Sequence, residues 1–284
     1  MKYKIAEILL EIPEEFITGH FARAVAPFAV LAGEPELKLE VADCPPPQPD
    51  YRELDSFDFA DADADCRFGV DSEGYLLEMA PRNGDAPARF RKHLNAPLVR
   101  TDYTPQHNPA LLRFGLWTNF NLAAIHHTAT AIHSSVISYK GSAVLFLGES
   151  GTGKSTHTRL WREHIAGAEL LNDDSPIICT EEGAMAYGSP WSGKTPCYRN
   201  IALPIKGIVR LSQAPKNEIR RLRPLEALGA LLPSVPPAFA REEVLQDTLC
   251  ELISRLIQQV PVYHLACLPN AEAAELACKT IFEA

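Results

Sequence analysis

Apolar residues are regularly spaced in the second part of the chain, from Pro109 onwards. Their recurrence at intervals of three and four residues predicts a helix with a buried face. Seven residues carry this pattern: Leu111, Leu112, Phe114, Leu116, Trp117, Phe120 and Leu122. A similar pattern near the C-terminus predicts a second buried helix. Its apolar face consists of Leu245, Leu249, Leu252 and Leu256.

Strands are predicted between these two helices. Residues 130–139 and 142–147 flank a Lys140-Gly141 turn, which indicates a hairpin whose second strand runs into Gly148. We then expect a helix over 154–165, a strand ending at Asn172, a hairpin across 180–183 and a strand over 205–211. A strand over 262–268 and a last helix after Asn270 complete a mixed α/β fold.

The first 108 residues have a less regular pattern. Short apolar stretches alternate with turn-rich segments, and four prolines between residues 45 and 49 form a stiff break. Residues 1–105 contain 20 acidic and 11 basic residues and so hold the whole net charge of −9. The acidic run at 55–65 is expected to be a solvated loop or sheet edge rather than a calcium loop. We therefore predict a small N-terminal mixed domain over 1–108 and a second domain over 109–284.

Composition narrows the location and the partners. No apolar stretch is long enough to span a membrane, and Glu7 and Glu11 interrupt what would be the apolar part of a signal peptide. We expect a cytoplasmic protein with no membrane partner. An acidic chain gives no basic footprint for nucleic acid. The seven cysteines are scattered, which favours reduced thiols over disulfides or zinc ligands.

The segment GESGTGKS, from Gly148 to Ser155, matches the phosphate-binding loop pattern G-x-x-x-x-G-K-[ST]. Glycines let successive backbone N–H groups point at phosphate oxygens, and the following helix adds its positive N-terminal dipole. Lys154 would reach the β and γ phosphates, and Ser155 would offer its hydroxyl to Mg²⁺. The sequence therefore predicts an ATP site with Mg²⁺. Its residues are Gly148, Glu149, Ser150, Gly151, Thr152, Gly153, Lys154, Ser155 and Thr156.

A second signal is the segment LLNDDS, in which a Leu-rich strand ends at Asn172, Asp173 and Asp174. A carboxylate at a strand end beside a phosphate loop is where kinases and related enzymes hold Mg²⁺. Two adjacent carboxylates allow one to bind the metal and the other to act as a base. The alternative is an ordinary turn before Pro176, because these residue types favour turns.

A third signal is His133, which the pattern places within the strand that pairs with the one entering Gly148. A histidine satisfied inside a sheet is the structural alternative. The remaining histidines near the loop, His126, His127, His157 and His164, lack the cysteine or carboxylate neighbours of a metal site.

The order of these elements resembles the catalytic domain of HPr kinase/phosphorylase and, more distantly, the nucleotide-binding half of phosphoenolpyruvate carboxykinase. That family has a histidine fifteen residues before the first loop glycine, as His133 precedes Gly148, then the loop, then an Asp-Asp pair. The resemblance covers about residues 125–284 and implies a P-loop kinase fold. It implies that Asp173 is the base or acid of phosphoryl transfer, paired with His133 and assisted by Lys154. Asp174 and Ser155 would attend Mg²⁺.

The chain also departs from that family. Thr156 follows the loop where the family usually has Glu, and the signature E-[IV]-R-G-x-G is missing. In its place, YGSPWSGKTPCYRN resembles the G-x-P-W-x-G segment of relatives of that kinase. Trp191, Lys194 and Arg199 are therefore candidate contacts for the substrate or the phosphates. The alternative is a connecting loop with Trp191 packed in the core.

These observations predict an ATP- and Mg²⁺-dependent kinase that phosphorylates a hydroxyl group, on either a protein serine or a small metabolite. A nucleotide-gated binding protein without transfer is the alternative from another class, although it would have no use for Asp173 and His133 together. A carboxykinase reaction on an oxo acid is a further alternative, for which no manganese-binding His and Lys set is evident. The family resemblance also suggests a homo-oligomer.

Overall fold

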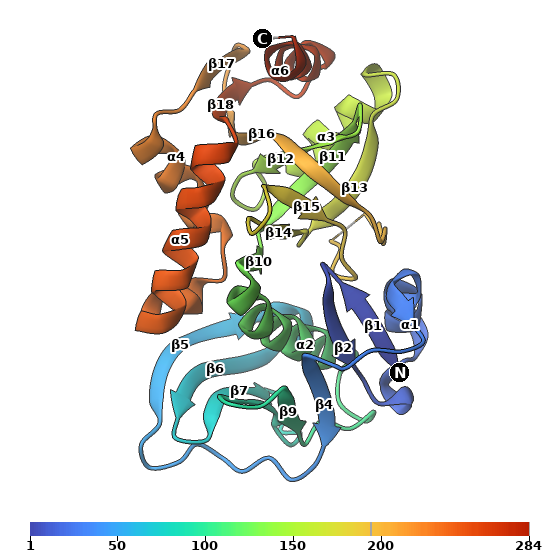
Figure 1. Ribbon diagram of the computed structural model, residues 1–284, viewed down its shortest axis with the longest axis vertical. Helices are drawn as coiled ribbons and strands as arrows, with labels where there is room; N and C mark the ends of the chain where they lie inside the picture. Colours follow the sequence, from blue (N-terminus) through green and yellow to red (C-terminus); the bar gives the residue numbers. More distant parts are fainter. Residues whose placement is uncertain (194, 284) are drawn as a thin grey trace. The chain divides into compact units, whose positions relative to one another are not determined.

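The computed structural model describes residues 1–193 and 195–283 and divides them into two compact units (Figure 1). The first unit comprises Met1–His126 and Pro237–Gln246, and the second comprises His127–Pro236 and Asp247–Ala284. The expected boundary at residue 108 therefore lies inside the first unit, because the helix that follows it belongs there. Residues 237–246 return to the first unit although they are late in the sequence.

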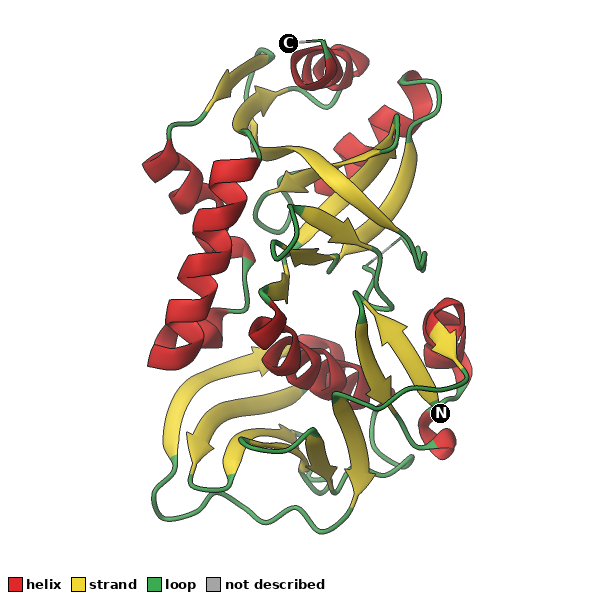
Figure 2. Ribbon diagram, viewed as in Figure 1, coloured by secondary structure: helices red, strands yellow, loops and turns green. Residues whose placement is uncertain are grey.

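The fold is mixed α/β, with 32% helix and 35% strand. Over the described ranges, the helices number six and the strands form two nine-stranded mixed sheets (Figure 2). No helix within those ranges is both long and apolar enough to cross a membrane.

The sheet of the first unit has the order β3-β1-β2-β4-β9-β8-β7-β6-β5. Most neighbours are antiparallel hairpin partners, whereas β4 lies parallel to both β2 and β9. The strands are β1 (Lys2–Ile5), β2 (Ile8–Glu11), β3 (Ala29–Val30), β4 (Leu37–Val41), β5 (Arg52–Phe59), β6 (Ala64–Asp71), β7 (Gly74–Pro81), β8 (Ala88–His93) and β9 (Leu98–Thr101). The helices of this unit are α1 (Gly19–Val25) and α2 (Pro109–Ala124).

Helix α2 confirms the periodicity seen from Pro109. The Asn108 side chain caps the helix by accepting the Ala110 N–H at 2.9 Å, and Pro109 occupies the first turn, where its missing N–H costs nothing. Gly115 allows close packing on the sheet, because a Cβ there would lie 2.5 Å from the Phe90 ring. The helix therefore packs tightly against β8 through a position that only glycine fits.

The acidic run at 55–65 was expected to be either a solvated loop or a sheet edge, and it forms the edge of this sheet. Strand β5 ends the strand order, and a short 3-10 helix, Ala60–Ala62, connects it to β6. Arg82 forms ion pairs with Asp58, Asp63 and Asp65. The arginine thus partly compensates the charge of these carboxylates.

The sheet of the second unit has the order β10-β14-β15-β16-β12-β11-β13, and β18 pairs with both β16 and β17. Its strands are β10 (Ala129–Ala131), β11 (Ser134–Tyr139), β12 (Ser142–Leu147), β13 (Glu169–Asp174), β14 (Ile177–Cys179), β15 (Met185–Tyr187), β16 (Ala202–Gln213), β17 (Glu218–Arg221) and β18 (Val262–Cys267). The helices are α3 (Lys154–His164), α4 (Pro224–Leu231), α5 (Glu243–Gln259), which begins in the first unit, and α6 (Ala271–Phe282).

Strand β12 lies inside this sheet and leads into the loop at Gly148. Lys140 and Gly141 both have positive φ, 48° and 72°, as expected for the tight turn that joins β11 to β12. Residues 143–147 are completely buried, between β11 on one side and the parallel strand β16 on the other. A rigid, buried strand therefore supports the start of the loop.

The C-terminal elements also follow the sequence pattern. The apolar face of α5 is buried, since Leu245, Leu249, Leu252 and Leu256 are each at most 1% exposed. Asn270 caps α6 by accepting the Ala273 N–H at 3.1 Å. The core under α3 and α6 includes Phe146, Trp161 and Ile281.

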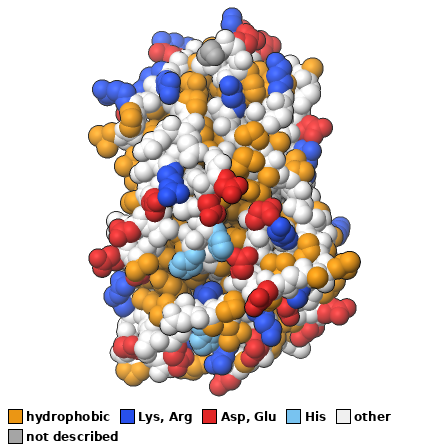
Figure 3. Space-filling view, in the orientation of Figure 1, with side chains coloured by type: hydrophobic (Ala, Val, Ile, Leu, Met, Phe, Trp, Pro, Cys, Tyr) orange, Lys and Arg blue, Asp and Glu red, His pale blue; other side chains and the backbone are white. Residues whose placement is uncertain are grey.

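The surface carries charges of both signs. On the face drawn in Figure 3, acidic and basic side chains are interspersed with apolar ones. All seven cysteines are free thiols, in agreement with the sequence expectation.

Candidate active site

The loop Gly148–Gly153 connects β12 to α3 and has the conformation that its glycines allow. Gly151 and Gly153 have φ of 83° and 103°, in the left-handed region that side chains disfavour. The Lys154 Nζ donates to the Gly148 carbonyl at 2.7 Å and so arches over the loop. Helix α3 begins at Lys154, so its first N–H groups adjoin the concave side of the loop.

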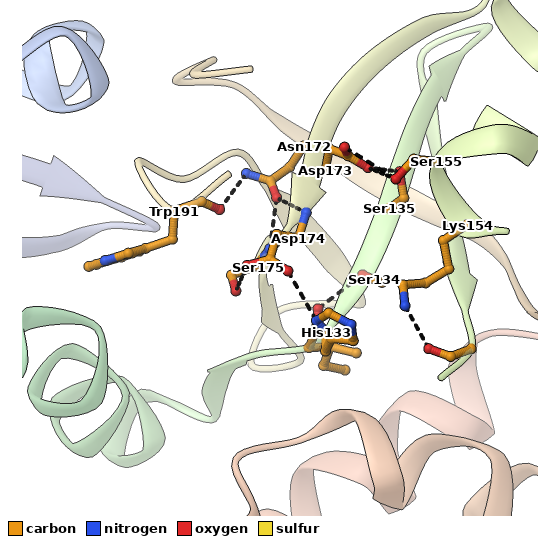
Figure 4. A network of polar contacts seen from close by, with 12 residues as sticks. His133, Ser134, Ser135, Lys154, Ser155, Asn172, Asp173, Asp174, Ser175 and Trp191 are labelled. Atoms are coloured by element: carbon orange, nitrogen blue, oxygen red, sulfur yellow. Dashed lines mark hydrogen bonds and ion pairs between the residues drawn. The ribbon is translucent and has the colours of Figure 1, made fainter. Parts of the chain in front are cut away.

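Asp173 is the buried carboxylate of the site. It is 5% exposed and accepts hydrogen bonds from the Ser135 and Ser155 hydroxyls at 2.7 and 3.1 Å (Figure 4). The Thr195 N–H also donates to it, at 3.2 Å. Ser155 is the last residue of the phosphate-loop pattern, so Asp173 is hydrogen-bonded to the position whose hydroxyl holds Mg²⁺ in P-loop NTPases.

Asp174 is the more accessible carboxylate. His133 Nδ1 lies 3.1 Å from its Oδ1 atom, and the Ser175 hydroxyl donates to Oδ2 at 3.1 Å (Figure 4). The expected pairings were therefore wrong in geometry: His133 contacts Asp174, and Ser155 contacts Asp173. The physical reason is strand alternation, which turns the side chains of adjacent residues at the end of β13 in different directions.

His133 also lies outside the strand in which it was expected. Strand β10 ends at Ala131 and β11 begins at Ser134, and between them the His133 N–H donates to the Ser234 carbonyl at 2.6 Å. Its side chain is 48% exposed. A residue in this break is free of the sheet, and its imidazole is accessible to a ligand.

Asn172 organises the end of strand β13, which carries both carboxylates, a role that the sequence pattern did not reveal. It is completely buried, and its Oδ1 accepts the N–H groups of Asp174 and Ser175. Its Nδ2 donates to Ser189 and to the Trp191 carbonyl at 3.3 Å. One amide thus joins the end of β13 to the G-x-P-W-x-G segment. The sequence feature that could have indicated this role is the position of Asn172 directly before the two aspartates.

The G-x-P-W-x-G segment packs against the end of β13, where Asp174 and Ser192 form an isolated antiparallel bridge. Gly193 donates its N–H to the Asp173 carbonyl at 2.7 Å, and a Cβ there would lie 2.5 Å from that oxygen. Trp191 is 2% exposed, so the core-packed alternative describes its side chain, which is not available to a substrate. Lys194, another candidate contact for the substrate or the phosphates, lies outside the described residues.

Arg199 points away from the loop. Its guanidinium donates to the Leu170 carbonyl at 2.9 Å and pairs with Glu169 at 2.9 Å, so it fastens the segment to the start of β13. This arrangement differs from the expected contact with substrate or phosphate. The long side chain reaches an adjacent strand where a carbonyl and a carboxylate satisfy its donors.

Charges of both signs surround the loop. Burial lowers the pKa of Lys154, Arg210 lowers it further, and the carboxylates of Asp174 and Asp173 oppose both effects. Arg210 lies 3.5 Å from the Glu149 carboxylate, which belongs to the loop. Two cations, Lys154 and Arg210, thus lie near the loop together with the carboxylates of Glu149, Asp173 and Asp174.

The loop, both aspartates and His133 line one cavity of about 430 Å³, within the size range of small-ligand sites. Ser150, Gly151, Gly153, Ser155 and Thr156 are part of this lining, with Glu149 and Lys154. Gly148 and Thr152 support the loop from outside that lining: the Thr152 hydroxyl donates to the Glu149 carbonyl at 2.8 Å. The site therefore brings together most of the residues that the sequence singled out.

The donor set fits Mg²⁺ bound together with a nucleotide. Mg²⁺ prefers one or two carboxylates with phosphate and water oxygens, rather than a complete protein cage. The described ranges contain no cluster of three His, Cys, Asp or Glu residues that could hold a metal alone. Asp173 and Ser155 supply one carboxylate and one hydroxyl, which is the incomplete set that phosphate oxygens would complete.

No protein-family model matches the chain, and no curated protein matches it.

Proposed function

We propose that this protein is an ATP-dependent phosphotransferase that moves the γ-phosphoryl group of Mg-ATP to a hydroxyl group. One observation carries the proposal: a phosphate loop, a carboxylate hydrogen-bonded to the loop serine and a carboxylate paired with a histidine line one cavity. A protein that only binds nucleotide would need the loop but not the pair of Asp174 and His133. The same sequence of elements underlies the resemblance to HPr kinase/phosphorylase.

The loop and the buried aspartate would hold the nucleotide. Backbone N–H groups and Lys154 would bind the β and γ phosphates, as helix N-termini and loop lysines do in P-loop proteins. Asp173 and Ser155 would hold Mg²⁺, which neutralises phosphate charge when bound. The oxygens of Asp173 already accept three hydrogen bonds, so this carboxylate is fixed in position.

Asp174 and His133 would handle the proton of the acceptor. The acceptor oxygen forms a bond to the γ phosphorus, the bond from that phosphorus to the bridging oxygen of ADP breaks, and the acceptor proton passes to the Asp174 carboxylate. His133 Nδ1, 3.1 Å from Oδ1, orients that carboxylate. We therefore assign the base to Asp174 and the metal contact to Asp173.

The test combines binding with transfer. The melting temperature of the protein is measured with and without millimolar Mg-ATP, and Lys154→Ala serves as the variant that should lose most of the increase. ATP labelled in the γ position is then incubated with a cell extract separated into protein and small-molecule fractions. Label in one fraction identifies the acceptor class as a protein serine or a hydroxylated metabolite.

Two outcomes would count against the proposal, in different ways. An unchanged melting temperature in the presence of Mg-ATP would contradict ATP binding itself. A clear increase without label in either fraction would favour a nucleotide-gated binding protein.

A further inference from the structure

A second cavity adjoins the phosphate cavity. It has a volume of about 530 Å³ and lies between the loop, the start of α3 and the ends of β16 and β18. Gly151, Gly153 and Thr156 line both cavities. A ligand with its phosphates on the loop can therefore continue into the second cavity without leaving the surface of the protein.

The wall of this cavity is mostly apolar. Leu160, Leu211, Cys267, Leu268 and Pro269 contribute to it, and among the described residues that line it none is acidic or basic apart from a histidine. That histidine, His157, is 3% exposed, and burial lowers its pKa to about 4, so it is uncharged near neutral pH. The cavity thus suits a flat, uncharged group and not a phosphate.

One amide side chain adds polarity to this apolar wall. The Gln213 Nε2 atom donates to the Gly151 carbonyl at 3.3 Å, so Gln213 connects the end of β16 to the phosphate loop. Among the residues that the structure describes, no other side-chain hydrogen bond of Gln213 is formed, so its carbonyl oxygen and second N–H could bind a ligand. Amide side chains can form two hydrogen bonds with the edge of an adenine base.

We infer that this second cavity is the nucleoside subsite: the base and ribose of the nucleotide lie against Leu160, Leu211 and Leu268, beside Gln213. The inference rests on the proposed function, because it requires phosphates on the Gly148–Ser155 loop. The loop motif itself does not indicate where the base and the ribose bind. Thr156, the residue after the motif, lies where the nucleotide passes from one cavity to the other.

The experiment compares Mg-ATP with Mg-tripolyphosphate, which has the phosphates but no nucleoside. Binding of both is measured by calorimetry to the wild type and to Ala214→Trp, which adds an indole to the cavity wall. Because the nucleoside contributes buried apolar area, Ala214→Trp should weaken Mg-ATP binding by ~10-fold or more. Binding of Mg-tripolyphosphate should stay within about twofold.

Lys216→Trp is the matched control, because it places the same side chain two residues along the chain, outside the cavity lining. The Lys216 side chain is 78% exposed. Lys216→Trp should bind both Mg-ATP and Mg-tripolyphosphate with the wild-type affinity. If a folded Ala214→Trp protein binds Mg-ATP as the wild type does, the nucleoside lies elsewhere and the inference is wrong, although the proposed function stands. If the wild type binds neither ligand, the proposed function fails as well.

A second measurement needs no variant and so does not depend on folding. Cys267 lines the cavity and is partly exposed. Mg-ATP should slow its alkylation, followed by mass spectrometry of the peptide, whereas Mg-tripolyphosphate should not. Cys250, exposed on α5, serves as the internal reference, and equal protection of Cys267 by both ligands would contradict the inference.

Discussion

In the first unit, the buried carboxylates of Asp71 and Glu78 contact arginines, whereas in the second unit the buried carboxylate of Asp173 contacts hydroxyl groups and one N–H. Burial alone would raise the pKa of Asp71, but hydrogen bonds from Arg91 and from two backbone N–H groups bring it below its usual value. Within residues 1–193 and 195–283, no arginine or lysine forms an ion pair with Asp173. The two units therefore differ in how buried charge is compensated.

Under the proposed function, this difference separates a structural charge pair from a carboxylate that would bind Mg²⁺. Burying a carboxylate is costly unless a cation or several donors compensate it. The pair of Arg91 and Asp71 is closed to solvent, because both side chains are at most 1% exposed. Asp173 instead faces a cavity where a cation can enter. Hydrogen-bond donors, and no cation among the described residues, compensate Asp173, so under the proposed function this carboxylate would be available to Mg²⁺ bound with the nucleotide.

The largest effect is expected from removing the arginine of the buried Arg91–Asp71 ion pair. Arg91→Met leaves the Asp71 carboxylate buried without its cation, so the free energy of unfolding should fall by about 3 to 5 kcal/mol. Chemical denaturation measures this loss. Mg-ATP affinity of the folded fraction should be unchanged, because the pair belongs to the other unit.

Arg67→Met is the control for this variant. Arg67 is half-exposed, and its partner Glu78 also contacts Arg89 at 2.7 Å. Its replacement should cost no more than about 1 kcal/mol. Equal losses for both variants would show that closure of the buried pair is not what stabilises the first unit.

A second expected effect concerns His157, a buried group of the second unit without a counter-charge. Its Nε2 atom accepts the Trp161 N–H at 3.2 Å, and burial lowers its pKa to about 4, compared with 6.5 in the unfolded chain. The unfolded chain therefore binds more protons between these two pH values. Stability should be fully present above pH 6.5 and fall on acidification, by about 3 kcal/mol at pH 4 for this group.

Denaturation curves from pH 7 to pH 4 measure this dependence. His157→Gln keeps a hydrogen-bond acceptor but does not titrate, so its stability should depend less steeply on pH. His164→Gln, at the exposed end of α3, should retain the wild-type dependence. A wild-type slope in His157→Gln would mean that other groups dominate acid unfolding.

The third effect separates the two aspartates of the site. If Asp174 is the base, Asp174→Asn should lower transfer by ~10²-fold while ATP still binds. Asp173→Asn should instead weaken the Mg²⁺ dependence and the grip on the nucleotide. It should not destabilise the protein without ligand, because it removes a buried negative charge and keeps the size of the side chain.

Transfer assays and Mg²⁺ titrations distinguish the two variants. His133→Ala should resemble Asp174→Asn, and the double variant should lose little more than either single one, because residues that act together are not additive. If Asp173→Asn loses transfer while Mg²⁺ binding is unaffected, the assignment suggested by the family resemblance was correct and ours is wrong.

The second unit was largely predictable from its sequence. The turn at Lys140 and Gly141, the buried strand before Gly148 and the leucine face of α5 depend on local patterns, and the structure confirms each of them. The pairing of His133 with Asp174 was not predictable in this way. It depends on the break between β10 and β11 and on the direction of two adjacent side chains at a strand end. Spacing along the chain does not determine either.

The first unit was much less predictable. Its strands β2, β4 and β9 are neighbours in the sheet although they are separated by many residues, and such pairings leave no local signal. Residues 237–246 join this unit through Glu242, whose carboxylate accepts from Tyr75 at 3.3 Å. Nothing near position 242 in the sequence indicates a partner near position 75.

The smallest effect concerns Arg199, which the sequence marked as a candidate for the substrate. Its guanidinium is occupied by the Leu170 carbonyl and by Glu169, each at 2.9 Å, and its side chain is 35% exposed. Because solvent screens the partly exposed pair, Arg199→Ala should lower the free energy of unfolding by only about 1 kcal/mol. The turnover of the folded protein should not change, since the partners of the Arg199 guanidinium in the described part of the chain, Leu170 and Glu169, lie at the start of β13 and not in the loop. Arg199→Lys should retain part of the stability. Denaturation and transfer assays on the same preparations measure both effects. A large loss of turnover at unchanged stability would instead support the predicted contact of Arg199 with the substrate or the phosphates.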